Sequence, residues 1–246
     1  MADSFPVFQK GFNYSQDGPG NRLVYHLWGC NLSCPWCANP EGLYKNNSLI
    51  FLTEEDIVAE ALSCRMMFFE GGGVTFTGGE VTLNCDRILH LIRALKLNSI
   101  HTCIETNASV DGCEELFKEV DYMIADYKSP SKEKLKEVTG ADLDIIEKNL
   151  ILRARTGKPL LVRIPLINGF NTSENDAVLF CEFFKKLSKA RKDNVFFEIL
   201  TYHEFGKDKY EKLSVTYTVS DGFVHTEDKQ RLANEILKNK LKLINT

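Results

Sequence analysis

The sequence predicts an α/β protein with a mostly parallel sheet. Six short, strand-like apolar runs alternate with longer amphipathic segments along the 246 residues. Since the crossover between two parallel strands usually carries a helix, this alternation indicates parallel pairing. We find no long linker, internal repeat or low-complexity segment, so we expect one domain over residues 1–246. An open sheet and a curved partial barrel both fit, and in either one the functional residues gather where strands lead into loops.

Local signals place the first elements. The run at 23–28 is expected to be the first strand. A helix is expected at 53–64, because Thr53 can serve as its N-cap and Asp56 puts a negative charge in the first turn. A short strand at 74–76 precedes a helix at 86–97, whose apolar residues share one face. Those residues are Ile88, Leu89, Ile92 and Leu95.

The later elements continue the alternation of strands and helices. The further expected strands are 100–104, 122–125, 160–164 and 195–200. The further expected helices are 113–120, 132–138, 143–155, 173–189 and about 229–241.

The composition excludes some classes of function. Hydrophobic residues make up 43% and charged residues 26%, with a formal net charge of −4 and a pI near 5.8. This balance argues against nucleic acid or an acidic membrane surface as the main partner. The N-terminus does not resemble a signal peptide, and no apolar run approaches the ~18–20 residues that span a bilayer, so we expect a cytoplasmic protein. In that compartment the eight cysteines should be reduced thiols or metal ligands, not disulfides.

The segment 29–39 carries the strongest chemical signal. Cys30, Cys34 and Cys37 form a C-x3-C-x2-C pattern directly after the first expected strand, so three thiolates can bind one cluster from a single loop. Iron–sulfur clusters normally take four cysteines, and three leave one iron open to a substrate or cofactor. A structural zinc site needs a fourth ligand, but the next cysteine, Cys64, has no neighbouring cysteine. We therefore predict a [4Fe–4S] cluster on these three residues.

Two glycine-containing segments add weaker signals. The stretch at 71–80 ends in Gly78, Gly79 and Glu80. Glycines allow close backbone approach and φ > 0, so this strand end offers main-chain groups and one carboxylate to a polar ligand. The other segment, Asp-Gly-Pro-Gly at 17–20, by itself indicates a tight turn.

Taken in order, these motifs resemble a known family. A C-x3-C-x2-C loop after the first strand, followed by a Gly-Gly-Glu strand end, resembles the radical S-adenosylmethionine (SAM) superfamily. The turn at 17–20, Glu-Thr-Asn at 105–107, Asp-Tyr-Lys at 126–128 and the segment 200–210 extend the likeness to the glycyl radical enzyme activases. Several separated motifs in one order are more specific than any one of them.

The resemblance implies roles for particular residues. The three cysteines would hold the cluster and be catalytic, and the Gly-Gly-Glu segment would bind the SAM amino group. Trp36 would pack near the adenine, although by itself it could be a core aromatic. Asp17 would lie near the incoming protein substrate, where a turn role is the alternative. The full set of cofactor-binding residues implied in this way is Trp36, Asn39, Gly78, Gly79, Glu80, Glu105, Thr106, Asp126, Lys128, Arg163 and His203.

Within that set the implied contacts differ. Lys128 and Arg163 would face the SAM carboxylate or its surroundings, and His203 would face the ribose. Arg163 could instead pair with an acid inside the sheet. The residues expected near the methionyl end, where some relatives hold a monovalent cation, are Glu105, Thr106 and Asp126. Glu105 is one methylene longer than the aspartate that is usual there.

The resemblance also implies a fold and a reaction. The fold would be an incomplete (β/α)6 barrel with the cluster at the C-terminal mouth of the strands. SAM would be cleaved reductively to methionine and a 5′-deoxyadenosyl radical, which abstracts hydrogen from a backbone glycine of a partner glycyl radical enzyme. Flavodoxin or ferredoxin would supply the electron.

Many activases also carry a cysteine-rich, ferredoxin-like insertion, which this sequence lacks. The cysteines at 64, 85, 103, 113 and 181 are scattered, so we expect one cluster and free thiols elsewhere. Two alternatives stay open: a radical SAM enzyme acting on a small molecule or another peptide, and a non-enzymatic iron–sulfur or zinc module.

Overall fold

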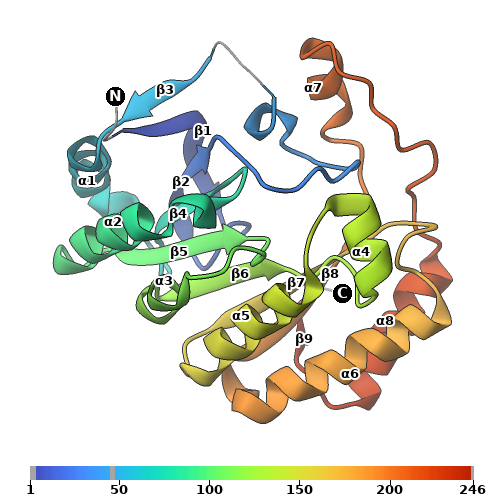
Figure 1. Cartoon of the computed structure of the whole chain (residues 1–246). Helices are drawn as coiled ribbons and strands as arrows, with labels where there is room; N and C mark the ends of the chain where they lie inside the picture. The colour runs from blue at the N-terminus through green and yellow to red at the C-terminus, as the bar shows by residue number, and fades with distance from the viewer. Residues whose placement is uncertain (1–3, 45–47, 245–246) are drawn as a thin grey trace. The chain divides into compact units, whose positions relative to one another are not determined.

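The computed structural model describes residues 4–44 and 48–244, which form an α/β fold. The hydrogen-bonded strands follow the order β3-β1-β2-β4-β5-β6-β7-β8-β9. Their bounds are β1 Phe5–Tyr14, β2 Asn21–Leu27, β3 Ile50–Leu52, β4 Gly73–Gly78, β5 His101–Thr106, β6 Tyr122–Asp126, β7 Leu160–Leu166, β8 Val195–Thr201 and β9 Leu243–Ile244. The helices are α1 Glu54–Ser63, α2 Cys85–Leu97, α3 Glu114–Glu119, α4 Lys132–Thr139, α5 Leu143–Arg155, α6 Glu174–Arg191, α7 Lys207–Lys212 and α8 Thr226–Lys238 (Figure 1).

The chain divides into two compact units. The first comprises Met1–Asn31, Asn39–Thr106 and Gly112–Ile124. The second comprises Leu32–Ala38, Asn107–Asp111 and Ala125–Thr246. Strand β6 begins in the first unit and ends in the second.

The sheet of the first unit combines parallel and antiparallel pairs. Strands β2, β4 and β5 are parallel neighbours, with Arg22 opposite Gly73 and Gly73 opposite His101. Strand β1 runs antiparallel to both β2 and β3. Because the central strands are parallel, their carboxyl ends, and the loops that follow them, lie at the same edge of the sheet.

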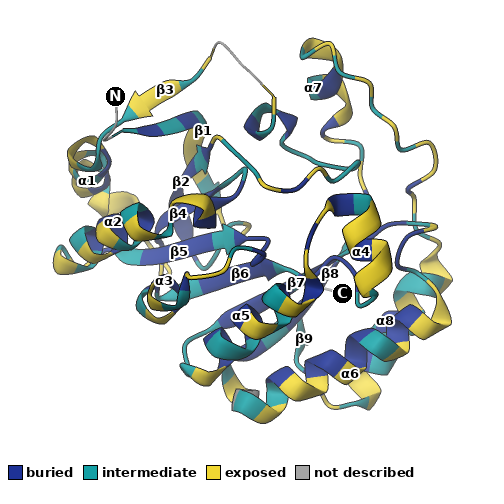
Figure 2. Ribbon diagram, in the orientation of Figure 1, coloured by how far each residue is buried: buried dark blue, intermediate teal, exposed yellow. Residues whose placement is uncertain are grey.

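One face of this sheet is covered by helices. Successive side chains of a strand point to opposite faces, and on this face Tyr25 of β2 stacks on Phe76 of β4 with 5.7 Å between ring centroids. The Tyr25 hydroxyl donates to Glu60 of α1 at 2.7 Å, which ties the helix to the sheet. Helix α1 begins as the sequence predicts, because Thr53 and Asp56 form a capping box. Figure 2 shows the dark-blue, buried residues that run along β4 and β5.

The second unit has an aromatic core. Strands β7, β8 and β9 are parallel, with Leu160 opposite Val195 and Phe197 opposite Leu243. Helix α6 packs against α5 and α8. The aromatic residues that meet between helix and sheet are Tyr127, Phe180, Phe183, Phe184 and Phe197. Ring pairs of this kind add stability beyond the area that they bury.

The predicted fold class is confirmed, and the sheet is wider than predicted. All six expected strands are present, as β2, β4, β5, β6, β7 and β8. The order of strands has two edges, β3 and β9, so the sheet is not closed. The sheet is mostly parallel, as the pairs of β2 with β4, β4 with β5, β7 with β8 and β8 with β9 show. The antiparallel strands β1 and β3, the short β9 and helix α7 were not predicted. The expectation of one domain stays a prediction.

Candidate functional site

In the first unit, the ends of β2 and β4 meet directly before Cys30. The Glu80 N–H donates to the Gly29 carbonyl at 2.6 Å. A Cβ atom on Gly79 would collide with that same carbonyl oxygen, and Gly78 has φ of +116°, which disfavours other residues. The two glycines are therefore needed for the close approach that brings Glu80 beside the residue preceding the first cysteine. The structure thus joins the Gly-Gly-Glu strand end to the residue that precedes Cys30, while the binding of a ligand at this strand end stays a prediction.

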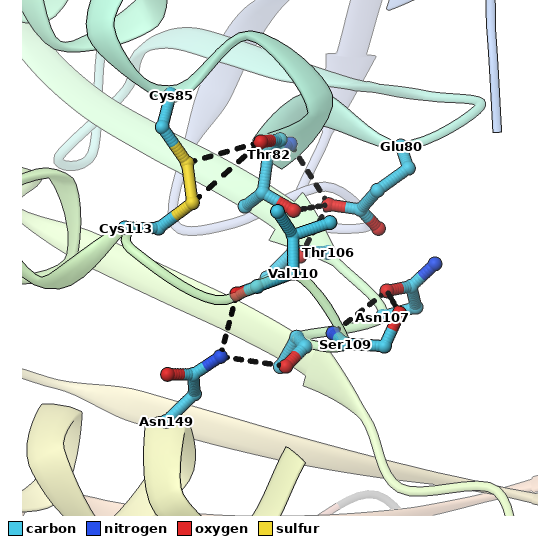
Figure 3. Close-up of a disulfide and its surroundings, with 10 residues drawn as sticks. Glu80, Thr82, Cys85, Thr106, Asn107, Ser109, Val110, Cys113 and Asn149 are labelled. Carbon is cyan, nitrogen blue, oxygen red and sulfur yellow. Dashed lines mark hydrogen bonds between the residues drawn. A yellow bond between two sulfur atoms is a disulfide. The ribbon is translucent and has the colours of Figure 1, made fainter. Parts of the chain in front are cut away.

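The Glu80 carboxylate is buried, with 3% of the residue exposed, and is held by three donors. Its Oε1 atom accepts from the Thr82 N–H at 2.9 Å, from the Thr82 hydroxyl at 2.5 Å and from the Thr106 hydroxyl at 2.5 Å (Figure 3). Hydrogen bonds to an ionised oxygen are stronger than neutral ones, so these donors fix the orientation of the carboxylate. Thr106, predicted to lie near a cation, thus has Glu80 as a partner.

Glu105 and Asp17 lie along one face of β4. Thr75 and Thr77 are two residues apart on that strand and share this face. The Thr77 hydroxyl donates to the Glu105 carboxylate at 2.7 Å, and the Thr75 hydroxyl donates to the Asp17 carbonyl at 2.7 Å. Asn13 also donates to the Asp17 carboxylate. The structure therefore joins the 17–20 turn to the strand that ends in Gly-Gly-Glu, while a role for Asp17 toward a protein substrate stays a prediction.

A disulfide joins Cys85 to Cys113, which corrects the expectation that the cysteines are unpaired thiols. The two Cα atoms are 5.5 Å apart, within the usual range for a bridge. The bridge links the start of α2 to the residue before α3. The sulfur atoms of Cys85 and Cys113 lie 3.0 and 3.6 Å from the Thr82 carbonyl oxygen, so the bridge packs behind the residue that holds Glu80 (Figure 3).

In the second unit, the segment of Cys34 and Cys37 forms a tight turn. The Cys37 N–H donates to the Cys34 carbonyl at 3.1 Å. The loop before α7 packs directly on this turn, because a Cβ atom on Gly206 would lie 2.5 Å from the Cys37 carbonyl oxygen. Cys30, Cys34 and Cys37 form no disulfide in the structure, and all three residues are partly buried.

The charges of Lys128 and Asp126 lie near the Cys34 thiol. Burial raises the pKa of Cys34 to about 11; the Lys128 cation opposes this rise, whereas the negative charges of Cys37 and Asp126 add to it. The Lys128 ammonium donates to the Asp126 carboxylate at 2.6 Å and is largely buried. The second unit thus places two predicted SAM-binding residues, Lys128 and Asp126, in the electrostatic environment of Cys34, a predicted cluster ligand.

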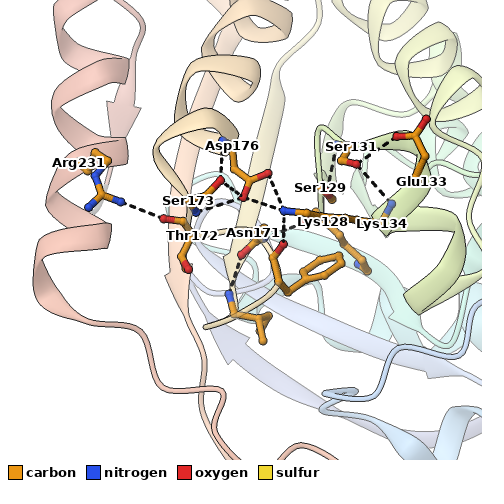
Figure 4. A network of polar contacts seen from close by, with 12 residues as sticks. Lys128, Ser129, Ser131, Glu133, Lys134, Asn171, Thr172, Ser173, Asp176 and Arg231 are labelled. Carbon is orange, nitrogen blue, oxygen red and sulfur yellow. Dashed lines mark hydrogen bonds and ion pairs between the residues drawn. The ribbon is translucent and has the colours of Figure 1, made fainter.

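The backbone of Lys128 is held by a buried amide. Asn171 is 1% exposed; its Nδ2 donates to the carbonyls of Lys128 and Pro165, both at 2.7 Å, and its Oδ1 accepts from the Ile167 N–H at 2.8 Å. Next to it, Lys134 pairs with Asp176 at the start of α6 (Figure 4). This network fixes the loops after β6 and β7.

The remaining predicted SAM-binding residues of the second unit have protein partners. Trp36 packs on Phe170 with 4.8 Å between ring centroids. Arg163 donates to the Glu198 carboxylate at 2.7 Å. Pairing with an acid was the alternative to a SAM contact that the sequence left open for Arg163. His203 is exposed and stacks on Phe205 at 4.2 Å, and partial desolvation lowers its pKa.

The cysteines fall in both units, with Cys30 in the first and Cys34 and Cys37 in the second. Within residues 4–44 and 48–244, the structure gathers no group of three or more His, Cys, Asp or Glu side chains that could hold a metal ion. The donor chemistry nevertheless fits an iron–sulfur cluster, because three unbridged thiols share one short segment and a cation lies near Cys34. Asn39, in the first unit, starts a short helical turn, and its carbonyl accepts from the Gly42 N–H at 3.0 Å. Ligation by the three cysteines stays a prediction.

Comparison with known proteins identifies the family. Residues 24–181 match the model of the Radical SAM superfamily. The chain belongs to this superfamily, whose enzymes use SAM and a [4Fe–4S] cluster. Among curated relatives, the pyruvate formate-lyase-activating enzyme of Streptococcus mutans is 30% identical over 236 residues, or 91% of this chain and 87% of the relative. That of Staphylococcus epidermidis is 32% identical over 217 residues, or 83% and 84%.

Solved structures agree on the fold. A domain of pyruvate-formate lyase-activating enzyme from Bacteroides vulgatus matches with a TM-score of 0.57 and 24% identity, covering 71% of this chain and 98% of that one. Streptococcus suis SuiB bound to the precursor peptide SuiA matches with a TM-score of 0.66 and 18% identity, covering 89% and 47%. In the described part of this chain, no helix is both long and apolar enough to cross a membrane.

Three residues that support the site were missed by sequence reasoning. Thr82 follows Glu80 by two positions, the spacing at which a backbone N–H donates to an N-cap side chain, so this spacing could have indicated the contact. Gly206 lies in the 200–210 segment, where a glycine between Phe205 and Lys207 could have indicated close packing. Asn171 gave no signal that distinguishes it from a turn residue.

Proposed function

We propose that this protein is a glycyl radical enzyme activase, with a large pyruvate formate-lyase-like enzyme as its substrate. Cys30, Cys34 and Cys37 would hold a [4Fe–4S] cluster. When bound, the cluster would supply one electron, received from a donor of the flavodoxin or ferredoxin type, for the reductive cleavage of SAM to methionine and a 5′-deoxyadenosyl radical. That radical would abstract hydrogen from a glycine Cα of the partner. The products are 5′-deoxyadenosine and a glycyl radical on the partner.

One observation carries the assignment: Glu80 donates its N–H to the carbonyl of the residue before Cys30. This contact supports a site in which an acid for the SAM ammonium stands beside a cluster ligand. The relatives named pyruvate formate-lyase-activating enzyme, which match most of the chain, support the choice of substrate.

The other residues have supporting roles in this proposal. Lys128 is a buried cation suited to the SAM carboxylate, since Asp126 and Asn171 hold it in place. Trp36 offers an aromatic face to the adenine and His203 a polar ring to the ribose. Asp17 would meet the partner's glycine loop. A monovalent cation near Glu105, Thr106 and Asp126 is proposed on the resemblance alone.

The test has two stages. The protein, reconstituted with iron and sulfide without air, should hold about four irons per chain. Cys34→Ala should lose most of this iron, whereas Cys64→Ala, which removes a free and similarly half-buried thiol, should keep it. Equal loss in both variants would contradict the cluster assignment.

In the second stage, reduced protein, SAM and the large enzyme are mixed and examined by electron paramagnetic resonance. A doublet signal that disappears when the partner's glycine becomes alanine supports the activase. If the partner gains no radical while a small metabolite or another peptide consumes SAM stoichiometrically, the chain belongs to a different branch of the superfamily.

A further inference from the structure

Glu80 and Thr82 form a two-residue unit at the end of β4. Glu80 precedes a short 3-10 helix, Val81–Asn84, and accepts from the Thr82 N–H as an N-cap residue does. The Thr82 hydroxyl adds a second donor from the same residue to the same Oε1 atom, at 2.5 Å. Thr106 supplies the third donor from the neighbouring strand β5.

The Thr82 hydroxyl cannot easily be replaced by water. Thr82 is 1% exposed and Glu80 is 3% exposed. On its other side Thr82 is backed by the disulfide, whose nearer sulfur lies 3.0 Å from the Thr82 carbonyl oxygen. Loss of the hydroxyl therefore leaves a buried carboxylate oxygen with one donor fewer, and the carboxylate is free to turn toward other partners.

We propose that Thr82 is a positioning residue that acts through Glu80, orienting its carboxylate for the ammonium group of SAM. This inference rests on the proposed function. Glu80 makes the contact with the ligand, and Thr82 sets the direction of that contact without touching the ligand.

Thr82→Val isolates the hydroxyl, because valine keeps the shape of the side chain and the backbone N–H. SAM affinity is measured by calorimetry on the reconstituted, unreduced protein. We expect the Kd for SAM to rise by about tenfold. This change corresponds to the free energy that one hydrogen bond of ordinary strength contributes. Thr82→Ser, which restores the hydroxyl, should bind within about twofold of wild type.

Thr102→Val is the matched control. Thr102 donates its N–H and its hydroxyl to one oxygen of Asp121, at 3.0 and 2.9 Å, the same arrangement at the opposite end of β5. It is also fully buried. Its substitution should lower the melting temperature about as much as Thr82→Val does, with no change in the Kd for SAM.

Modified ligands distinguish an effect on the orientation of the Glu80 carboxylate from a general loss of rigidity in the binding site. With a SAM analogue that carries hydrogen in place of the α-amino group, Thr82→Val and wild type should bind equally. Decarboxylated SAM, which keeps the amino group, should retain the difference. If Thr82→Val does not fold, Thr82→Ala takes its place with the same expectations.

The outcomes distinguish this inference from the proposed function. If wild type does not bind SAM, the proposed function fails. If wild type binds SAM and Thr82→Val binds it equally well, the positioning role is overturned. The same holds if Thr102→Val weakens binding to the same extent, or if the penalty persists with the analogue that lacks the amino group.

Discussion

The charge of Arg22 is buried among hydrogen-bond acceptors of the first unit. Arg22 is fully buried, and its guanidinium donates to the Thr75 hydroxyl at 2.6 Å and to the Val74 carbonyl at 2.7 Å. Burial lowers its pKa from the usual arginine value. One of its nitrogens lies 3.3 Å from Nδ1 of His101, which can accept from it only while that nitrogen is unprotonated. The pair therefore links the stability of the first unit to pH.

We expect the protein to lose stability as the pH falls below about 6.5. Burial, and next the charge of Arg22, lowers the pKa of His101 to about 4, so between these two values the unfolded chain binds a proton that the folded chain does not. The free energy of unfolding should fall by about 1–2 kcal/mol from pH 7 to pH 5, allowing for partial screening.

Urea unfolding at the two pH values measures this effect. His101→Gln keeps an acceptor for Arg22 and cannot titrate, so its loss of stability between pH 7 and pH 5 should be smaller by that amount. A wild type and a variant with the same pH dependence would show that His101 is not the group responsible.

Helices and strands with a clear periodic pattern of apolar residues could be predicted from the sequence. Strands that are defined mainly by their hydrogen bonds to a neighbouring strand could not. Helix α5, Leu143–Arg155, was predicted to the residue because its apolar positions recur at helical spacing. Strand β1 was missed because Gly11 and the exposed residues around it interrupt its alternation. Strand β3 is three residues long and β9 is two, and α7 buries only Tyr210 among five charged residues.

The same distinction applies to the site. The close approach at Gly78 and Gly79 was indicated by the glycines themselves, because glycine permits positive φ and close backbone contact. The SAM-binding role of these residues and Glu80 came from the family resemblance and stays a prediction. The Cys85–Cys113 disulfide was not predicted, because its two cysteines are 28 positions apart and the cytoplasmic location expected from the sequence favours thiols.

The loop before α7 supports the turn of Cys34 and Cys37 by close contact. We expect Gly206→Ala to lower stability by about 1–3 kcal/mol, because the added methyl group meets the Cys37 carbonyl oxygen. In the reconstituted protein the same change should reduce the iron retained, as read from metal analysis and visible absorbance.

Gly11→Ala is the control for this substitution. Gly11 has no neighbouring atom within 4 Å of an added Cβ, and its backbone does not need positive φ. Its iron content should equal that of wild type. If Gly206→Ala also retains full iron, the contact does not position the turn.

The disulfide should contribute to the stability of the first unit. A disulfide that closes a loop of this length should stabilise the fold by about 3–4 kcal/mol, because it restricts the unfolded chain. Cys85→Ser should therefore lower the free energy of unfolding by about 3–4 kcal/mol. Urea unfolding of the apoprotein with and without a thiol reductant measures it. Wild type should respond to the reductant and Cys85→Ser should not; an unresponsive wild type would mean that the bridge adds no stability.

Along the whole chain, the order of the motifs supports the same assignment as the contact between Glu80 and Gly29. In the first unit the cysteine segment begins after β2 and the Gly-Gly-Glu starts at the last residue of β4, so both lie at the carboxyl ends of parallel strands. In the second unit Asp126 is the last residue of β6 and Lys128 follows it. Strand ends are where parallel sheets usually carry functional residues. The residues behind it, such as Thr82 and Asn171, depend on tertiary packing and became visible only in the structure.

The bridge between Cys85 and Cys113 also affects how reducing equivalents are counted. A disulfide accepts two electrons together with two protons, whereas an iron–sulfur cluster of the proposed kind accepts one electron at a time. Oxidised protein that holds both would consume about three electrons per chain, and only one of them could lead to 5′-deoxyadenosine. The amount of 5′-deoxyadenosine formed per electron supplied would then be too low a measure of how efficiently the cluster uses its electrons. Reduction of the disulfide by a thiol beforehand would remove this error.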